Sequence, residues 1–207
     1  MISGLIEACL AGWLLLAANG TEASSVDRLL RSLAREPPQT VPFVEVRRSP
    51  LLDEDLVVSG ELEYRGPGRL SRVVTAPYHE RTDIDGTDVR IHREGRPERR
   101  FSLQRSAELG SLMSAFSALL GGNRTALEQA FEPRIVIQAD GWQLDLLPRA
   151  GVTQGDVEKV VVQGKDDTPA CISLWMRSSG QATVIRLGDA AQDTRQTRDC
   201  GFGPRDD

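Results

Sequence analysis

The chain has 207 residues, with 25 Lys and Arg against 30 Asp and Glu and a formal net charge of −5 at pH 7. This length suits one domain with extensions and allows a sizeable buried core. The negative charge argues against nucleic acid as the main partner, because phosphate binding requires a basic surface.

The N-terminal segment has features of a signal peptide. Its apolar run, Leu10 to Ala18, is too short to span a membrane as a helix. Thr21-Glu22-Ala23 suits a signal peptidase, and Ala18-Asn19-Gly20 offers a second cleavage position. The segment is atypical, because no Lys or Arg precedes the run and Glu7 lies close to it. We predict a signal peptide over 1–23, a single domain over 24–188 and a polar tail over 189–207. A buried amphipathic helix is the alternative for the N-terminal segment. Cys9 follows no small-residue lipobox, so we expect no lipid anchor there.

The domain is predicted to begin with a helix capped by Ser25. Its apolar residues follow helical spacing, and Glu36-Pro37-Pro38 ends it. They are Val26, Leu29, Leu30 and Leu33. A strand over 41–47 follows, with Phe43 and Glu45 on one side. Leu51 and Leu52 are then expected in a loop, where they are candidates for exposure.

Residues 56–92 predict an antiparallel meander of four strands. The period of two over 56–65 and 69–75 is typical of strands with one dry face. Gly66-Pro67-Gly68, Ala76-Pro77 and Asp85-Gly86 are turn sequences between the strands. A further strand is predicted over 100–103.

The period then changes to three and four residues, which predicts a helix over about 106–120. Ser106 caps it and Gly121-Gly122 ends it. Its apolar residues are Leu109, Leu112, Met113, Phe116, Leu119 and Leu120. A second short helix is capped by Asn123 or Thr125 and closed by Pro133.

Strands resume at 135–139, 142–147, 157–163, 170–177 and 183–187, with turns at Asp140-Gly141 and Ser179-Gly180. The fold class is therefore α+β, mainly antiparallel β. We expect a half-open curved barrel covered by a helical lid, because so many short-turned strands must curve. Periodicity leaves open whether the concave face encloses a cavity or a filled core.

The order of these elements and motifs resembles the LolA-like family of periplasmic outer-membrane lipoprotein carriers. The motifs that carry the resemblance occur in order within 25–187. They are the segment from Ser59 to Leu70, Thr75-Ala76-Pro77, and Asp83-Ile84-Asp85-Gly86. The resemblance implies a half-open barrel with a helical lid over an apolar cavity for acyl chains. It also implies transfer between an inner-membrane exporter and an outer-membrane acceptor.

The resemblance also suggests site residues. Those expected to line the lipid cavity are Leu62, Tyr64, Leu70, Val74, Leu109, Leu112, Met113, Phe116 and Leu120. In the lipoprotein carriers an Arg directly before the turn Pro is thought to hold the lid shut, but Gly66 stands there in this chain. Arg65 and Arg69 are the alternative latch candidates. The departure leaves the cargo open between lipoprotein and another lipid, such as a glycolipid, phospholipid or aryl polyene.

Catalytic and metal-binding motifs do not emerge from the sequence. His79 and His92 lack metal-ligand spacing, and no nucleophile elbow, P-loop or dinucleotide fingerprint occurs. The acidic clusters Asp53-Glu54-Asp55 and Asp166-Asp167 lack a calcium-loop pattern and are interpreted as solvated turns. We therefore expect no enzyme, metal or cofactor.

Cysteine usage fits an oxidising compartment. If Cys9 leaves with the signal peptide, Cys171 and Cys200 form an even pair. We predict a disulfide that holds the tail against the sheet; a buried free Cys171 is the alternative.

Two function classes remain. The first is a periplasmic carrier for acyl chains that serves outer-membrane biogenesis as a lipid chaperone. The second is a non-catalytic envelope interaction module, accessory to a lipid export system.

Overall fold

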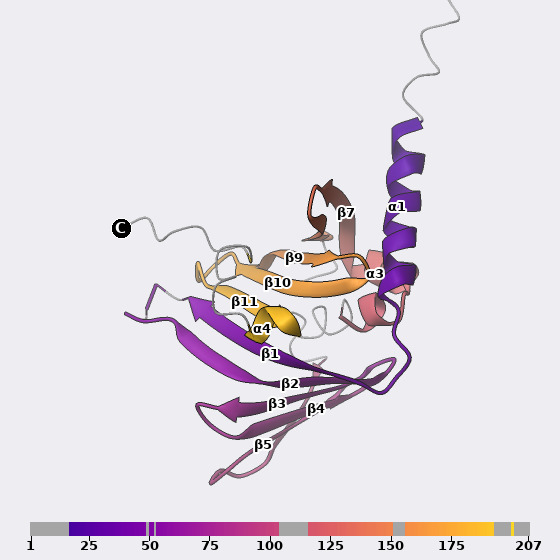
Figure 1. Cartoon of the computed structure of the whole chain (residues 1–207). Coiled ribbons are helices and arrows are strands. Elements are labelled where there is room, and N and C mark those ends of the chain that lie inside the picture. Colours follow the sequence, from indigo (N-terminus) through magenta and orange to yellow (C-terminus); the bar gives the residue numbers. More distant parts are fainter. Residues whose placement is uncertain are drawn as a thin grey trace, which may run out of the picture.

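The computed structural model describes residues 17–48, 50–51, 53–103, 116–150, 156–192 and 200, with side chains from Ser25 onward. Eleven strands and a few helices make up this part of the chain (Figure 1). The helices are α1 (Ala17–Leu33), α3 (Arg124–Ala130) and α4 (Asp189–Gln192). The strands are β1 (Gln39–Arg48), β2 (Leu56–Gly66), β3 (Arg69–Ala76), β4 (Glu80–Asp85), β5 (Asp88–Arg93), β6 (Arg99–Ser102), β7 (Phe131–Gln138), β8 (Gly141–Pro148), β9 (Val157–Lys165), β10 (Thr168–Met176) and β11 (Ala182–Leu187).

All the strands belong to one antiparallel sheet with the order β6-β5-β4-β3-β2-β1-β11-β10-β9-β8-β7. Its single non-sequential pairing joins β1 to β11, with Phe43 opposite Leu187. β6 and β7 form the two edges, so the sheet does not close into a ring. Figure 1 shows strands β1 to β5 turning away from β9 to β11, with α1 and α3 at one side. This confirms the predicted class of a mainly antiparallel, half-open curved barrel with helices.

The predicted meander is confirmed as β2 to β5, each strand hydrogen-bonded to the next. Tyr64 pairs with Leu70, Leu70 with Ile84, and Ile84 with Val89. Directly paired residues share a face of the sheet, so these four side chains form one row. We call this face, which packs against the helices, the core face, and the opposite one the outer face.

The predicted start of the first helix is wrong for the full chain. Ser25 was expected to cap it, but α1 runs from Ala17 through Ser25 to Leu33. Residues 17–24 contain no proline, so no residue there forces the helix to begin only at Ser25. The predicted end is confirmed, because α1 stops before Glu36-Pro37-Pro38.

The short second helix is confirmed as α3, and its cap is Asn123. The Asn123 side chain accepts a hydrogen bond from the Ala126 amide at 3.0 Å. The prediction that Pro133 closes this helix is wrong, because Phe131 already starts β7 and Pro133 lies inside that strand. An edge strand tolerates proline, because one side of it needs no amide donor. Of the longer helix before α3, residues 116–120 are described and helical, whereas Ser106 lies outside the described residues.

Candidate functional site

Much of the core face is filled by helical side chains. Apolar residues of α1, of the segment 116–120 and of α3 pack with strands β1 to β3 and β7 to β11 in one cluster. Leu30, Leu127, Phe131 and Leu144 are fully buried there. The alternative of a filled core therefore holds for this region of the sheet.

A pocket of about 260 Å³ remains towards the β3 to β6 side. It lies where the β2–β3 and β4–β5 turns approach segment 116–120 and the start of α3. Its lining is Pro67, Gly68, Leu70, Ile84, Gly86, Leu103, Ser117, Ala118, Gly121, Asn123 and Ala126. Ile84 and Leu103 also belong to a small cluster that includes Val89 and packs against Leu70. The wall is thus mainly aliphatic, and an apolar group that enters it leaves water.

The turn between β2 and β3 binds the helical segment directly. The Gly68 amide donates a hydrogen bond to Ser117 Oγ at 2.9 Å, and Gly68 O accepts one from the Gly86 amide at 2.9 Å. Gly66 adopts φ +120°, a conformation that favours glycine over an arginine at this place. The contact between turn and helix is therefore made by backbone and a hydroxyl group.

Of the two latch candidates, Arg65 makes other contacts in the described residues. Arg65 lies on the outer face, where its Nη2 donates to Asp83 Oδ1 at 2.8 Å and to Ser71 Oγ at 3.1 Å. A register shift between Tyr64 and Gly66 marks a bulge, yet Arg65 still reaches this outer cluster. Arg69 is exposed at the start of β3. That Arg65 or Arg69 holds the helical lid shut by a contact with residues 104–115 stays a prediction, because residues 104–115 lie outside the described part of the chain.

The residues predicted to bind lipid are spread over several environments. Leu70 lines the pocket, whereas Tyr64 and Val74 are buried. Leu62 and Phe116 are partly buried and pack on the main core. Leu120 is partly exposed, and Leu109, Leu112 and Met113 lie outside the described residues. The structure therefore brings Leu70 to the pocket, and the lipid contacts themselves stay predictions.

The sequence analysis missed a charged group on the core face. Glu45 is 3% exposed, and its Oε2 accepts a hydrogen bond from Arg72 Nη2 at 2.6 Å. Arg47 donates to the other carboxylate oxygen of Glu45. Alternation along β1 and β3 already placed Glu45 beside Phe43 and Arg72 between Leu70 and Val74. That pattern was the signal, since a charge on a dry face requires a partner.

Tyr64 and Asp83 are among the described titratable groups that have shifted pKa values. Burial, and then the charge of Glu36, raises the pKa of Tyr64 above its usual 10.0. For Asp83, burial alone would raise the pKa. Hydrogen bonds from Arg81 and Ser71, together with the charges of Arg81 and Arg65, outweigh burial and lower the pKa below 3.8. The contacts named here account for both pKa shifts, so the shifts need no catalytic role for Tyr64 or Asp83 as an explanation.

The acidic clusters and histidines show no metal-binding arrangement. Asp167 pairs with Arg35 at 3.5 Å and Asp55 pairs with Arg48 at 3.5 Å. His79 and His92 are exposed. Across the part of the chain that is described, no three His, Cys, Asp or Glu side chains gather closely enough to hold a metal ion.

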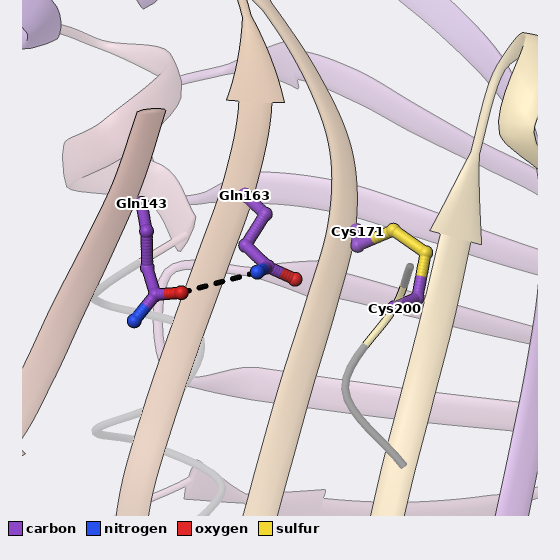
Figure 2. Close-up of a disulfide and its surroundings, with 4 residues drawn as sticks. All are labelled: Gln143, Gln163, Cys171 and Cys200. Carbon is purple, nitrogen blue, oxygen red and sulfur yellow. Dashed lines mark hydrogen bonds between the residues drawn. A yellow bond between two sulfur atoms is a disulfide. The ribbon is translucent and has the colours of Figure 1, made fainter. Parts of the chain in front are cut away.

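The structure joins Cys171 to Cys200 by a disulfide, with 5.6 Å between their Cα atoms (Figure 2). Cys171 lies in β10 on the outer face, in a row with Gln143 of β8 and Gln163 of β9, which share a hydrogen bond of 3.1 Å. Both cysteines are buried with Val184. This agrees with the predicted attachment of the tail to the sheet.

Two further surface features bear on partners. Leu51 is 88% exposed in the loop before β2, while Leu52 lies outside the described residues. Val136 and Ile137, at 47% and 72% exposed, lie at the β7–β8 hairpin.

Among the described helices, none has the length and apolar character needed to cross a membrane.

Comparison with known proteins gives one family. The model described as "Outer membrane lipoprotein carrier protein LolA-like" matches residues 18–202. The chain is similar to a LolA superfamily protein from Nitrosomonas europaea, at 14% identity, 81% coverage of this chain, 92% of the other and a TM-score of 0.43. It is also similar to a DUF1329 family protein from Desulfovibrio piger, at 12% identity, 81% and 92% coverage and a TM-score of 0.42. A third similar structure is the Pseudomonas aeruginosa MucA/MucB complex, at 12% identity, 79% and 55% coverage and a TM-score of 0.40. No curated protein sequence matches the chain.

Proposed function

The chain belongs to the LolA-like family of outer membrane lipoprotein carrier proteins, and from this premise we propose that it carries acyl chains in the periplasm. In this proposal it receives a lipoprotein or another lipid from an inner-membrane exporter and delivers it to an outer-membrane acceptor. No reaction on the lipid is proposed, and the role is that of a carrier.

The observation that supports this proposal is the apolar pocket between the sheet and the helical segment. Each methylene group transferred from water into such a space contributes about 0.8 kcal/mol, so an acyl chain needs a dry slot more than polar contacts. The volume of about 260 Å³ lies just under the range of about 300–1,000 Å³ for ligand pockets. We therefore propose that the described pocket receives the end of an acyl chain.

A pocket-filling substitution tests this role. Ala126 lines the pocket from α3, whereas Gln129 on the same helix is exposed. In Ala126→Phe the added ring takes the place of ligand carbon atoms. Exclusion of about two methylene groups weakens binding by about tenfold. Affinity for dodecanoate is measured by displacement of N-phenyl-1-naphthylamine, a neutral fluorescent reporter.

Gln129→Phe adds the same ring outside the pocket and is the matched control, with affinity expected to remain within about twofold of the parent chain. Lipid extraction and mass spectrometry of the purified protein accompany this measurement. An acyl species that co-purifies with the parent chain and is depleted in Ala126→Phe supports the carrier. Equal dodecanoate binding by both variants contradicts the proposed pocket.

The second candidate is a non-catalytic envelope interaction module. The exposed Val136 and Ile137 near the β7–β8 hairpin favour it, because two aliphatic side chains left in water at a sheet edge suit contact with a partner. A protein that binds no amphiphile in the displacement assay favours this module over the carrier.

A further inference from the structure

We propose that the hairpin of β5 and β6 docks the protein on a membrane surface rich in anionic phospholipids, where its arginines bind the lipid phosphates. We call residues 90–100, which form most of this hairpin, the basic hairpin. The inference goes beyond the proposed function, because it concerns a surface that meets the bilayer and does not involve the pocket.

The first step is the charge of the basic hairpin. It contains five Arg against two Glu, a net charge of +3 with His92 neutral, whereas the whole chain has −5. The rest of the chain therefore sums to −8. A concentration of positive charge on an otherwise acidic protein directs anionic partners to this place. The five arginines are Arg90, Arg93, Arg96, Arg99 and Arg100.

The second step is that most of this charge is available to a partner. Four of the five arginines are exposed, and Arg93 is partly buried. The Arg93 guanidinium stacks over Tyr78 at 4.0 Å, and Arg100 Nε donates to Glu98 Oε1 at 2.5 Å. Within the part of the chain that the structure describes, the side chains of the other three make no ion pair or hydrogen bond. These three are Arg90, Arg96 and Arg99.

The third step is a repulsive contact within the hairpin. Arg90 lies directly opposite Arg100 on the outer face, and like charges in opposed positions destabilise a sheet. On its other side Arg90 lies opposite Asp83, whose carboxylate already binds Arg65 and Arg81. Charge at a sheet edge discourages unwanted pairing, but a mixture of signs serves that purpose equally well. A phosphate group bound between Arg90 and Arg100 instead removes their repulsion.

The fourth step is the way the arginines are distributed around the hairpin. Arg90 and Arg100 lie on the outer face, Arg93 and Arg99 lie on the core face, and Arg96 is in the turn between the strands. Figure 1 shows β5 at the margin of the sheet, on the far side from α1. Charges on both faces and in the turn do not converge on one small anion. A layer of phosphate groups around the tip of the hairpin meets all of them.

The fifth step is the composition of the hairpin surface. Among the described residues, the exposed large apolar side chains all lie outside the basic hairpin. A stable interface with another protein usually has an apolar centre. Attraction between arginines and an anionic bilayer needs none. The basic hairpin therefore suits a membrane surface better than an acidic protein.

Sedimentation of the full chain with lipid vesicles tests this docking surface. Affinity for vesicles of equimolar phosphatidylglycerol and phosphatidylcholine is divided by affinity for vesicles of phosphatidylcholine alone. Apolar contacts of any segment with lipid are common to both vesicles and cancel in this ratio. Each Arg close to an anionic surface increases affinity about fivefold, so the parent chain is expected to prefer the anionic vesicles at least about tenfold. The preference is expected to fall as salt is raised.

Paired substitutions assign the preference to the basic hairpin. Arg96→Gln with Arg99→Gln is expected to lower affinity for anionic vesicles by about 25-fold and to leave affinity for neutral vesicles unchanged. Arg96→Lys with Arg99→Lys keeps the preference, because attraction to the surface depends on charge. Arg28→Gln with Arg31→Gln removes the same charge from exposed positions of α1 and is the matched control. It is expected to stay within about twofold of the parent chain at about 0.1 M salt, where charges beyond about 10 Å are screened.

Equal affinity of the parent chain for the two kinds of vesicle overturns the docking surface, as would be observed if the basic hairpin bound only an acidic protein. A preference that survives Arg96→Gln with Arg99→Gln, or that the α1 control reduces to the same extent, also overturns it. Ala126→Phe is expected to bind anionic vesicles like the parent chain. Loss of dodecanoate binding and loss of vesicle binding therefore report on the two proposals separately.

Discussion

The Asp83 carboxylate accepts more hydrogen bonds than any other carboxylate on the outer face of the meander. Arg65 Nη2 donates to Oδ1 at 2.8 Å and Arg81 Nε donates to Oδ2 at 2.9 Å, while Ser71 donates to Oδ1. These contacts favour the ionised form and keep the pKa of Asp83 low even though burial opposes it. At the residue scale, Arg65 is thus part of a charged cluster that links β2, β3 and β4.

Asp83→Asn tests this cluster through the pH dependence of stability. A depressed pKa in the folded state contributes stability above the unfolded pKa, and this contribution is lost as pH falls through the folded value. We expect the substitution to lower the free energy of unfolding at pH 7. It should also reduce the loss of stability from about pH 5 to about pH 2, the window in which such a carboxylate titrates. Urea unfolding across this range measures both effects. Asp88→Asn, at an exposed position of β5, is the control; parallel acid losses in the parent chain and Asp83→Asn would contradict the argument.

At the scale of elements, edge position and cross-links decide details that propensity leaves open. Pro133 is accepted inside β7 because that strand is the edge of the sheet. The Cys171–Cys200 disulfide closes a separation of 29 residues and holds Cys200 beside β10.

Removal of the disulfide is expected to lower the free energy of unfolding by about 3–4 kcal/mol, because the cross-link restricts the unfolded chain. The double substitution Cys171→Ala with Cys200→Ala is compared with the parent chain in urea. Added reductant should lower the stability of the parent chain and leave that of the double variant unchanged. Peptide mapping without reductant that recovered both thiols free would contradict the cross-link.

At the scale of the whole molecule, the helices divide the core face into a filled region and a pocket. Among the described side chains, those that α1 contributes to the main core are Val26, Leu29, Leu30 and Leu33. We propose that residues 1–23 are a signal peptide whose removal leaves these core residues and the domain intact.

A chain that starts at Ser24 tests this proposal. It is expected to keep the far-ultraviolet circular dichroism and the unfolding midpoint of the longer chain, since Val26, Leu29, Leu30 and Leu33 are retained. N-terminal sequencing of the exported protein is expected to begin at Ser24. A large loss of stability in the shortened chain would instead support the alternative of a buried amphipathic helix.

The sequence by itself determined most of the strands, the meander, the short helix α3 and the pairing of the two later cysteines. The strands, the meander and the short helix depend on period, turn residues and hydrogen bonds between residues near one another in the chain, whereas the cysteine pairing was predicted from the even number left once Cys9 is removed. Alternation also placed Leu70 and Arg72 on one face. Only the tertiary structure decided that Leu70 lines a pocket while Val74 is packed, because both fit the same alternating pattern. It likewise decided that Arg72 reaches across β2 to Glu45 and that Arg65 binds Asp83. Such contacts join residues far apart in the chain, and they follow from the curvature of the sheet and the helices laid against it.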